Sequence, residues 1–130
     1  HNLTVTVNCK ETLEIDTYPL AFVQVVTNLI LNCVLHGFEA EDEGHIQINV
    51  VQQDSLIDLR VSDDGKGISE KNFGKIFDPF FTTKRSKGMT GLGLHIVFNI
   101  ITQKMNGTIR CESTEGQGTT FIIQLPMFNN

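Results

Sequence analysis

Alternating apolar and polar residues predict several β-strands. Residues 3–8 read Leu-Thr-Val-Thr-Val-Asn, the alternation expected of a half-buried strand. The glycine-containing segment 115–118 is expected to join two of the strands as a hairpin. In chain order, the expected strands cover residues 3–8, 13–15, 46–51, 56–61, 108–111 and 119–125.

Apolar residues at helical spacing predict two longer helices. Pro19 suits the first turn of a helix that runs to about His36, where Gly37 is placed to end it. Leu92 to Met105 has the same spacing, and Gly107 follows it. Because helices and strands mix without strict alternation, we expect an α+β, two-layer α/β sandwich: a mixed, mostly antiparallel sheet backed by about three helices.

Composition limits the classes of protein that fit. With 130 residues, 40% of them hydrophobic, the chain suits a single domain over residues 1–130. A net charge of −5 argues against a nucleic-acid binder or direct contact with an anionic membrane. The three cysteines are widely spaced, which favours a reducing, cytoplasmic setting over a disulfide framework. The strand-like start without an initiator Met indicates a fragment of a longer protein.

A row of polar side chains interrupts the first helix. Gln24, Asn28, Asn32 and His36 are each four residues apart, so they share one helix face. Burying amides is costly unless they are hydrogen-bonded. The row is therefore either a hydrogen-bonded core network or the wall of a cleft, in which an Asn oxygen ligates a hard cation such as Mg²⁺.

Two glycine segments suggest a nucleotide. In the sequence Asp63-Asp64-Gly65-Lys66-Gly67, a carboxylate at a strand end lies next to backbone that a planar ligand can approach, and it can accept from an amine such as adenine's. An ordinary turn is the alternative. In residues 88–94, glycines that lead into a helix present N–H groups to phosphates, although the spacing is not that of a Walker loop. A flexible loop is the alternative there.

Basic residues gather before the second helix. No acidic residue lies between Asp78 and Glu112, and Lys84, Arg85 and Lys87 stand beside glycines. This cluster suits a polyphosphate or forms a solvated basic loop.

Taken in order, these motifs resemble those of sensor histidine kinases. Residues 28–32 resemble the N box, 63–68 the first glycine box, 77–84 the F box, 88–94 the second glycine box and 116–121 the final one. The resemblance covers residues from about 16 to 126, and the F box is its most specific part. It implies the Bergerat ATP-binding fold shared with gyrase, Hsp90 and MutL ATPases, with a mobile lid over residues 77–88.

The resemblance also implies roles for individual residues, with ATP and Mg²⁺ as cofactors. Asn32 would ligate Mg²⁺, Asp63 would bind the adenine amine, and Thr119 would reach adenine. Asn28, Asn32 and Lys84 would be the catalytic residues. The full nucleotide-binding set would be Asn28, Asn32, His36, Asp63, Gly65, Gly67, Ile68, Phe77, Thr82, Thr83, Lys84, Gly88, Gly91, Leu92, Gly93, Leu94 and Thr119.

One position separates the members of this fold. Relatives that deprotonate water or a hydroxyl carry a Glu four residues before the metal-binding Asn, whereas this chain has Asn28, which cannot take a proton. A neutral imidazole needs no such base, so Asn28 favours a histidine acceptor. Leu35 departs from the family's usual Lys and removes one phosphate contact.

The sequence therefore predicts the ATP-binding catalytic domain of a two-component sensor kinase. It would present the γ-phosphate to a histidine on a missing dimerisation domain, and the phosphoryl group would then pass to an Asp of a response regulator. His1, His45 and His95 lack the following acidic residue of a phosphoacceptor motif. We expect a monomeric domain from a homodimeric parent. A degenerate nucleotide-binding module without catalysis and an anti-sigma-type serine kinase are the alternatives.

Overall fold

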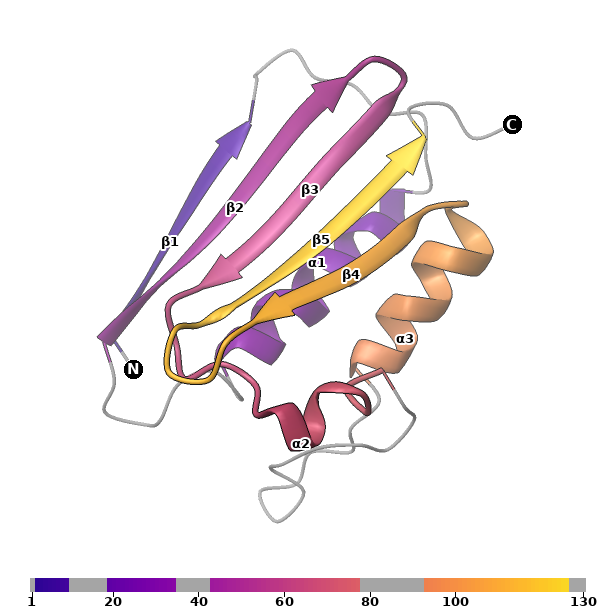
Figure 1. The fold of residues 1–130 in the computed structure, drawn as a ribbon. Helices are drawn as coiled ribbons and strands as arrows, with labels where there is room; N and C mark the ends of the chain where they lie inside the picture. Colours follow the sequence, from indigo (N-terminus) through magenta and orange to yellow (C-terminus); the bar gives the residue numbers. More distant parts are fainter. Residues whose placement is uncertain (1, 10–18, 35–42, 78–92, 127–130) are drawn as a thin grey trace.

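A five-stranded mixed sheet forms one layer of the molecule. The computed structural model describes residues 2–9, 19–34, 43–77 and 93–126. The strands lie in the order β1-β2-β3-β5-β4 (Figure 1). β1 and β2 are parallel, and the other neighbours are antiparallel, which confirms the predicted mixed, mostly antiparallel sheet. The strands are β1 (Asn2–Cys9), β2 (Glu43–Gln53), β3 (Leu56–Asp63), β4 (Thr108–Ser113) and β5 (Thr119–Pro126).

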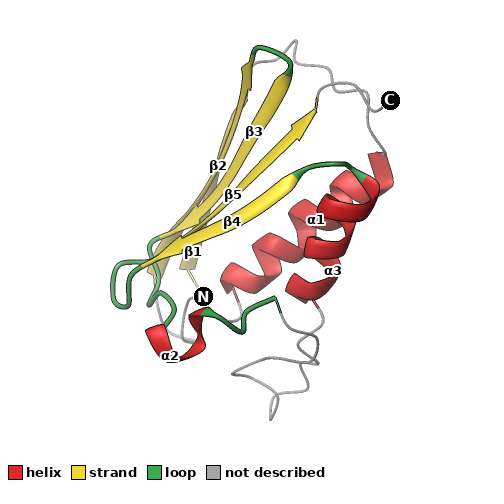
Figure 2. Cartoon of the chain, turned by 45° about the vertical axis from the view of Figure 1, so that its right-hand side comes forward, coloured by secondary structure: helices red, strands yellow, loops and turns green. Residues whose placement is uncertain are grey.

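Two helices cover one face of the sheet. α1 (Pro19–Asn32) and α3 (Gly93–Asn99) lie side by side beneath the strands, as Figures 1 and 2 show from two directions. This confirms the two-layer α+β prediction. Among the described residues, no helix is long and apolar enough to cross a bilayer.

The expected number of backing helices, about three, was too high for the part of the chain that the structure describes. α2 (Glu70–Phe73) is a single turn at the end of the sheet. The N–H of Phe73 donates to the carbonyl oxygen of Ser69 (3.0 Å), which closes that turn. One turn fixes several dihedral angles for few hydrogen bonds, and a helix this short therefore depends on its surroundings for stability. The predicted strand at 13–15 lies outside the described residues.

The second helix ends in a widened turn against β5. α3 continues as a π-helical turn, η3 (Ile100–Lys104), and the N–H of Met105 donates to the carbonyl oxygen of Ile100 (3.0 Å). A Cβ on Gly107 would lie 2.5 Å from the carbonyl oxygen of Gln124, so the backbone passes directly against β5. The helical turn ends at Lys104, Asn106 follows with φ +54°, and Gly107, the predicted residue after the helix, permits this close approach.

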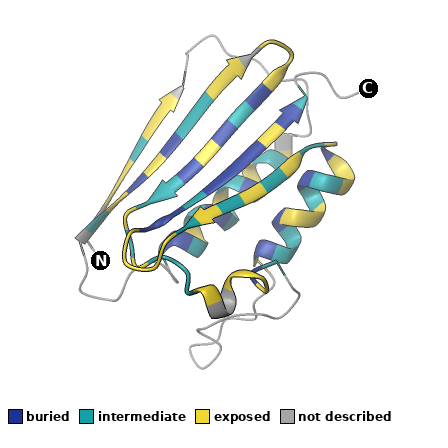
Figure 3. Ribbon diagram, in the orientation of Figure 1, coloured by how far each residue is buried: buried dark blue, intermediate teal, exposed yellow. Residues whose placement is uncertain are grey.

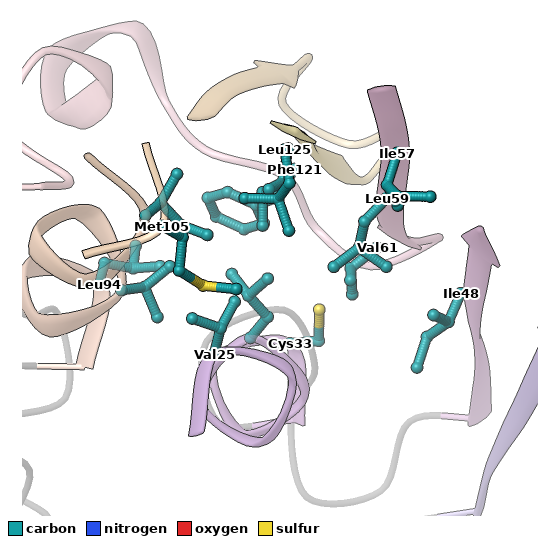
Figure 4. Close-up of a cluster of buried hydrophobic side chains, with 14 of the residues drawn as sticks. Val25, Cys33, Ile48, Ile57, Leu59, Val61, Leu94, Met105, Phe121 and Leu125 are labelled. Atoms are coloured by element: carbon teal, nitrogen blue, oxygen red, sulfur yellow. The ribbon is translucent and has the colours of Figure 1, made fainter. Parts of the chain in front are cut away.

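The core fills the space between sheet and helices. The inward residues of β3 alternate along the strand and are fully buried, namely Ile57, Leu59 and Val61. The facing residues recur every four positions along α1 and just past its end, at Val25, Leu29 and Cys33. Figure 4 labels Val25 and Cys33 of this row. The remaining contacts come from β2, β5, α3 and η3, through Ile46, Ile48, Leu94, Val97, Ile101, Met105, Phe121, Ile123 and Leu125.

The opposite face of the sheet is mostly polar, and among its described apolar residues Val51 and Leu56 are exposed whereas Ile122 is buried. The strand register places Ile122 on the face away from the helices, yet only 1% of its surface is exposed. Figure 3 colours the strands by burial and shows exposed and buried residues on this side of the sheet. The strand register places Arg60 and Arg110 on either side of it. Arg60 is paired with Asp58 at 2.9 Å, and Arg110 with Glu112, so both arginines are held on the strands that flank Ile122.

The two faces of β3 provide a matched test of this core. Leu59 is completely buried, whereas Leu56, three residues earlier, is 44% exposed. Leu59→Ala should lower the free energy of unfolding by about 2–5 kcal/mol because it leaves a cavity. Leu56→Ala should lower it by less than about 1 kcal/mol. Urea denaturation measures both, and equal losses would contradict the assigned faces.

Candidate functional site

The carboxylate of Asp63 lies at the end of β3, on the face of the sheet that the helices cover. Its Oδ1 accepts from the N–H of Gly65 (2.9 Å). Burial raises the pKa of this carboxyl group, and hydrogen bonds from the Gly65 N–H, the Cys33 thiol and the Thr119 N–H offset part of that rise. The pKa stays above its ordinary value. Among the described residues, the groups that shift it include no cation.

Cys33 supplies the contact from α1. The residue is 1% exposed, and burial raises the pKa of its thiol, with a further rise from the charge of Asp63. The thiol therefore stays protonated and donates to Asp63. Sequence reasoning missed this contact, although Cys33 continues the buried Val25 and Leu29 stripe one residue after Asn32. Cys111 on β4 is also reduced, and burial raises its pKa to about 12.

Two glycine loops interlock beside Asp63. The N–H of Gly116 donates to the carbonyl oxygen of Lys66 (2.6 Å), which joins the β4–β5 turn to the loop after β3. Gly67 has φ +73°, and a Cβ there would lie 2.3 Å from the carbonyl oxygen of Thr114. Gly118 has φ +97°, and its Cβ would lie 2.1 Å from the carbonyl oxygen of Asp63. Only glycine allows these two approaches.

A serine hydroxyl that sequence reasoning also missed joins the same two loops. Ser113 Oγ accepts from the N–H of Ile68 (2.8 Å) and donates to the carbonyl oxygen of Gly118 (2.9 Å). It also lies 2.9 Å from Thr119 Oγ1. Thr119 is 7% exposed and lies opposite Asp63 in the strand register. The structure therefore brings together two residues that were predicted for adenine recognition, Asp63 and Thr119.

The two predicted asparagines border the buried face of α1. Asn28 and Asn32 are half-buried, and each comes directly before a buried residue, Leu29 or Cys33. Gln24, from the same predicted row, is exposed. Because the thiol of Cys33 contacts Asp63, the last turn of α1 places Asn32 one residue away from that contact. The predicted metal and phosphate roles of the two asparagines stay predictions.

The start of the predicted F box is anchored on α3. The Phe77 ring centroid lies 5.5 Å from that of Phe98 and 6.3 Å from that of Phe121. His95 Nδ1 lies 3.3 Å from the carbonyl oxygen of Phe77, and the Asn99 amide nitrogen lies 3.2 Å from His95 Nε2. A hydrogen on Nδ1 and a lone pair on Nε2 satisfy both contacts.

Several predicted residues have other surroundings or are not described. Leu94 is buried in the core, and Gly93 begins α3 exposed to solvent. Their predicted nucleotide contacts stay predictions, as does that of Phe77. The predicted residues outside the described part of the chain are His36, Thr82, Thr83, Lys84, Gly88, Gly91 and Leu92, together with Leu35, Arg85 and Lys87.

Known proteins match both the sequence and this arrangement. Residues 17–129 match the model of the histidine kinase-, DNA gyrase B-, and HSP90-like ATPase family. The chain belongs to this family. As a histidine kinase-like ATPase domain it is expected to bind ATP, and the resemblance inferred from the motifs is confirmed.

Relatives of this ATPase domain are sensor kinases. It is 40% identical over 114 residues to the sensor histidine kinase ZraS of Escherichia coli K12, covering 88% of this chain and 23% of ZraS. It is 41% identical over 103 residues to sporulation kinase A of Bacillus subtilis, and the match covers 79% of this chain and 16% of that kinase. The chain thus spans about a quarter or less of these curated relatives.

A solved structure has the same fold. The nucleotide-free catalytic domain of the histidine kinase ThkA superposes with a TM-score of 0.82 and 32% identity. The match covers 98% of this chain and 80% of that one. The ATPase domain described here is therefore a histidine kinase catalytic domain in its fold and family.

The pKa values of the two aspartates of β3 should be shifted in opposite directions from the ordinary aspartate value. Burial of Asp58 alone would raise its pKa, but hydrogen bonds from Arg60 and Gln124 outweigh it and lower that pKa below the ordinary aspartate value, whereas burial raises the pKa of Asp63 above it. Carboxyl ¹³C NMR, with Asp63→Ala for assignment, measures both. An Asp63 pKa at or below the ordinary aspartate value would contradict the effect of its burial.

The same shifts have opposite consequences for stability. Folding favours the protonated form of Asp63, so the stability it adds is present below the unfolded pKa and is lost as pH rises through the folded value. Folding favours ionised Asp58, so its contribution is present above the unfolded pKa and is lost as pH falls through the folded value. In unfolding free energies measured over a pH series, removing Asp63 should therefore abolish the loss of stability as pH rises and keep the loss that Asp58 causes as pH falls.

Proposed function

We propose that this chain is the ATP-binding catalytic domain of a two-component sensor histidine kinase. It holds Mg-ATP so that the γ-phosphate reaches a histidine on a dimerisation domain of the same protein. From there the phosphoryl group passes to an Asp of a response regulator. The names of the relatives, sensor histidine kinase and sporulation kinase, support this proposal, as does the shared fold.

The observation that carries the proposal is the half-buried carboxylate of Asp63. Its two oxygens offer about four acceptor positions. The N–H groups of Gly65 and Thr119 and the thiol of Cys33 occupy three of them. Within the described ranges no cation shifts its pKa. Partly burying an ionised acceptor without such a partner is costly for the fold, and such groups are typical of binding sites. The remaining position suits the exocyclic amine of adenine.

The residues of α1 suit the phosphate end of the ligand. A bound Mg²⁺ would neutralise phosphate charge, and the amide oxygen of Asn32 is the kind of ligand that this hard cation takes alongside water. Asn28 cannot remove a proton from an attacking hydroxyl, but an imidazole acceptor already carries a lone pair. The domain's own residues therefore bind and orient the nucleotide, and positioning provides most of the catalysis.

The setting of the reaction follows from the same proposal. ATP is the substrate, and the reduced thiols of Cys33 and Cys111 suit a reducing compartment, so we place the domain in the cytoplasm. The histidine-bearing domain and the response regulator are its proposed partners.

Asp63→Ala should abolish adenine-nucleotide binding and leave the fold intact. A charged hydrogen bond contributes about 1.5–3 kcal/mol, so affinity for a non-hydrolysable ATP analogue should fall at least about tenfold by calorimetry. The neighbouring carboxylate of Asp64 is exposed and accepts from the N–H of His45 (2.8 Å), so Asp64→Ala is the matched control and should bind normally. Unchanged affinity in Asp63→Ala would refute the adenine assignment.

Asn32→Ala should remove the dependence of nucleotide binding on Mg²⁺. Calorimetric titrations with and without Mg²⁺ should differ for the wild type and coincide for the variant, because the amide ligand is gone. Gln24→Ala, an exposed position on the same helix, should keep the full Mg²⁺ response. Binding in Asn32→Ala that still responds fully to Mg²⁺ would refute its role. A wild type that binds no nucleotide would favour a degenerate signalling module.

A further inference from the structure

The hydroxyl group of Ser113 is fully engaged by its surroundings. A serine hydroxyl has one hydrogen to donate and two lone pairs to accept with. The hydrogen goes to the buried carbonyl oxygen of Gly118 (2.9 Å). One lone pair accepts from the N–H of Ile68 (2.8 Å). A single lone pair of Ser113 Oγ therefore remains for Thr119.

This count determines the direction of the bond between the two hydroxyl groups. Thr119 Oγ1 lies 2.9 Å from Ser113 Oγ. Because the Ser113 hydrogen is already used, Thr119 must donate its own hydrogen to Ser113. Thr119 Oγ1 is then left with lone pairs only, so toward any third group it acts as a hydrogen-bond acceptor.

The adjacent group on β3 has the same polarity. Asp63 lies opposite Thr119 in the strand register, and its carboxylate accepts from the backbone N–H of Thr119. An ionised carboxylate can only accept hydrogen bonds. This end of the site therefore has two hydrogen-bond acceptors, the Asp63 carboxylate and Thr119 Oγ1. The Thr119 hydroxyl hydrogen is already used in the bond to Ser113.

We propose that Ser113 is a positioning residue that sets base specificity by holding the Thr119 hydroxyl as an acceptor. The proposal rests on the proposed function, in which Asp63 and Thr119 face the base. A purine with a 6-amino group donates to such a pair, directly or through a water molecule. A 6-oxo purine carries an acceptor at the 6-position and a hydrogen on N1, so the protein acceptor that faces the 6-position is left against another acceptor, which weakens binding. Ser113 thus acts through Thr119 without touching the base.

Nucleotide pairs that differ at the 6-position test this proposal. ADP and IDP share the sugar and phosphates, and their affinities are measured by calorimetry with Mg²⁺ on the 130-residue chain. In Ser113→Ala, the Thr119 hydroxyl has lost its acceptor and can turn to donate to the 6-oxo group. We expect ADP affinity to fall about five- to tenfold, with IDP affinity unchanged or higher. Ser113→Thr, which keeps a hydroxyl, should restore the preference for ADP.

A hydroxyl pair on the other face of the sheet supplies the control. Thr120 Oγ1 donates to Ser62 Oγ (3.1 Å), one position along from the Thr119 and Asp63 pair. Ser62→Ala removes a comparable strand-to-strand bond and should leave the ADP-to-IDP ratio unchanged. If Ser113→Ala does not fold, Thr119→Val removes the acceptor itself and should lower the same ratio.

The outcomes separate a specificity role from simple support. An equal loss of ADP and IDP affinity in Ser113→Ala would mean that Ser113 only holds the loops together, and would overturn the proposal. An unchanged ratio in both Ser113→Ala and Thr119→Val would overturn it as well. In either case the wild type still binds ADP and the proposed function survives. A wild type that binds neither nucleotide would overturn both.

Discussion

The burial of one carboxylate constrains the arrangement of the whole site. Asp63 ends β3 on the face of the sheet that the helices cover. The N–H groups of Gly65 and Thr119 and the thiol of Cys33 reach it from three separate segments of the chain. Gly118 has to be glycine because its backbone passes against the Asp63 carbonyl oxygen. The β4–β5 turn can then close on the loop after β3, where Gly67 leaves room for Thr114. Each of these contacts depends on the others.

Function and stability oppose each other at this point. Burial raises the pKa of Asp63, which means that the ionised form is disfavoured by the fold. The large core between sheet and helices supplies the stability that tolerates it. The same carboxylate is held by fixed donors from Gly65, Cys33 and Thr119. A ligand with a matching donor gains a hydrogen bond that the protein has already oriented.

Much of the fold follows from local patterns. Residues 46–51 and 56–61 are correctly predicted as strands, because alternation follows from one buried face. Residues 3–8 also form a strand, but the expected half-burial is wrong for its described part, since Val5 and Val7 are exposed. The start of α1 at Pro19 is correct as well. Ile122 was expected within a strand, but its burial on the polar face depends on Arg60 and Arg110 from neighbouring strands. In the part of the chain that the structure describes, two helices rather than about three back the sheet, and the segment after Ser69 forms only one turn.

By itself the sequence determined the fold class, the family and the acid at the end of β3. These depend on periodicity and on short motifs whose residues are close along the chain. Only the tertiary structure decided the partners of Asp63 and the direction of the hydroxyl bonds between Ser113 and Thr119. Cys33 and Ser113 are 30 or more positions from Asp63. Such contacts arise from strand register and helix packing, which no local pattern specifies.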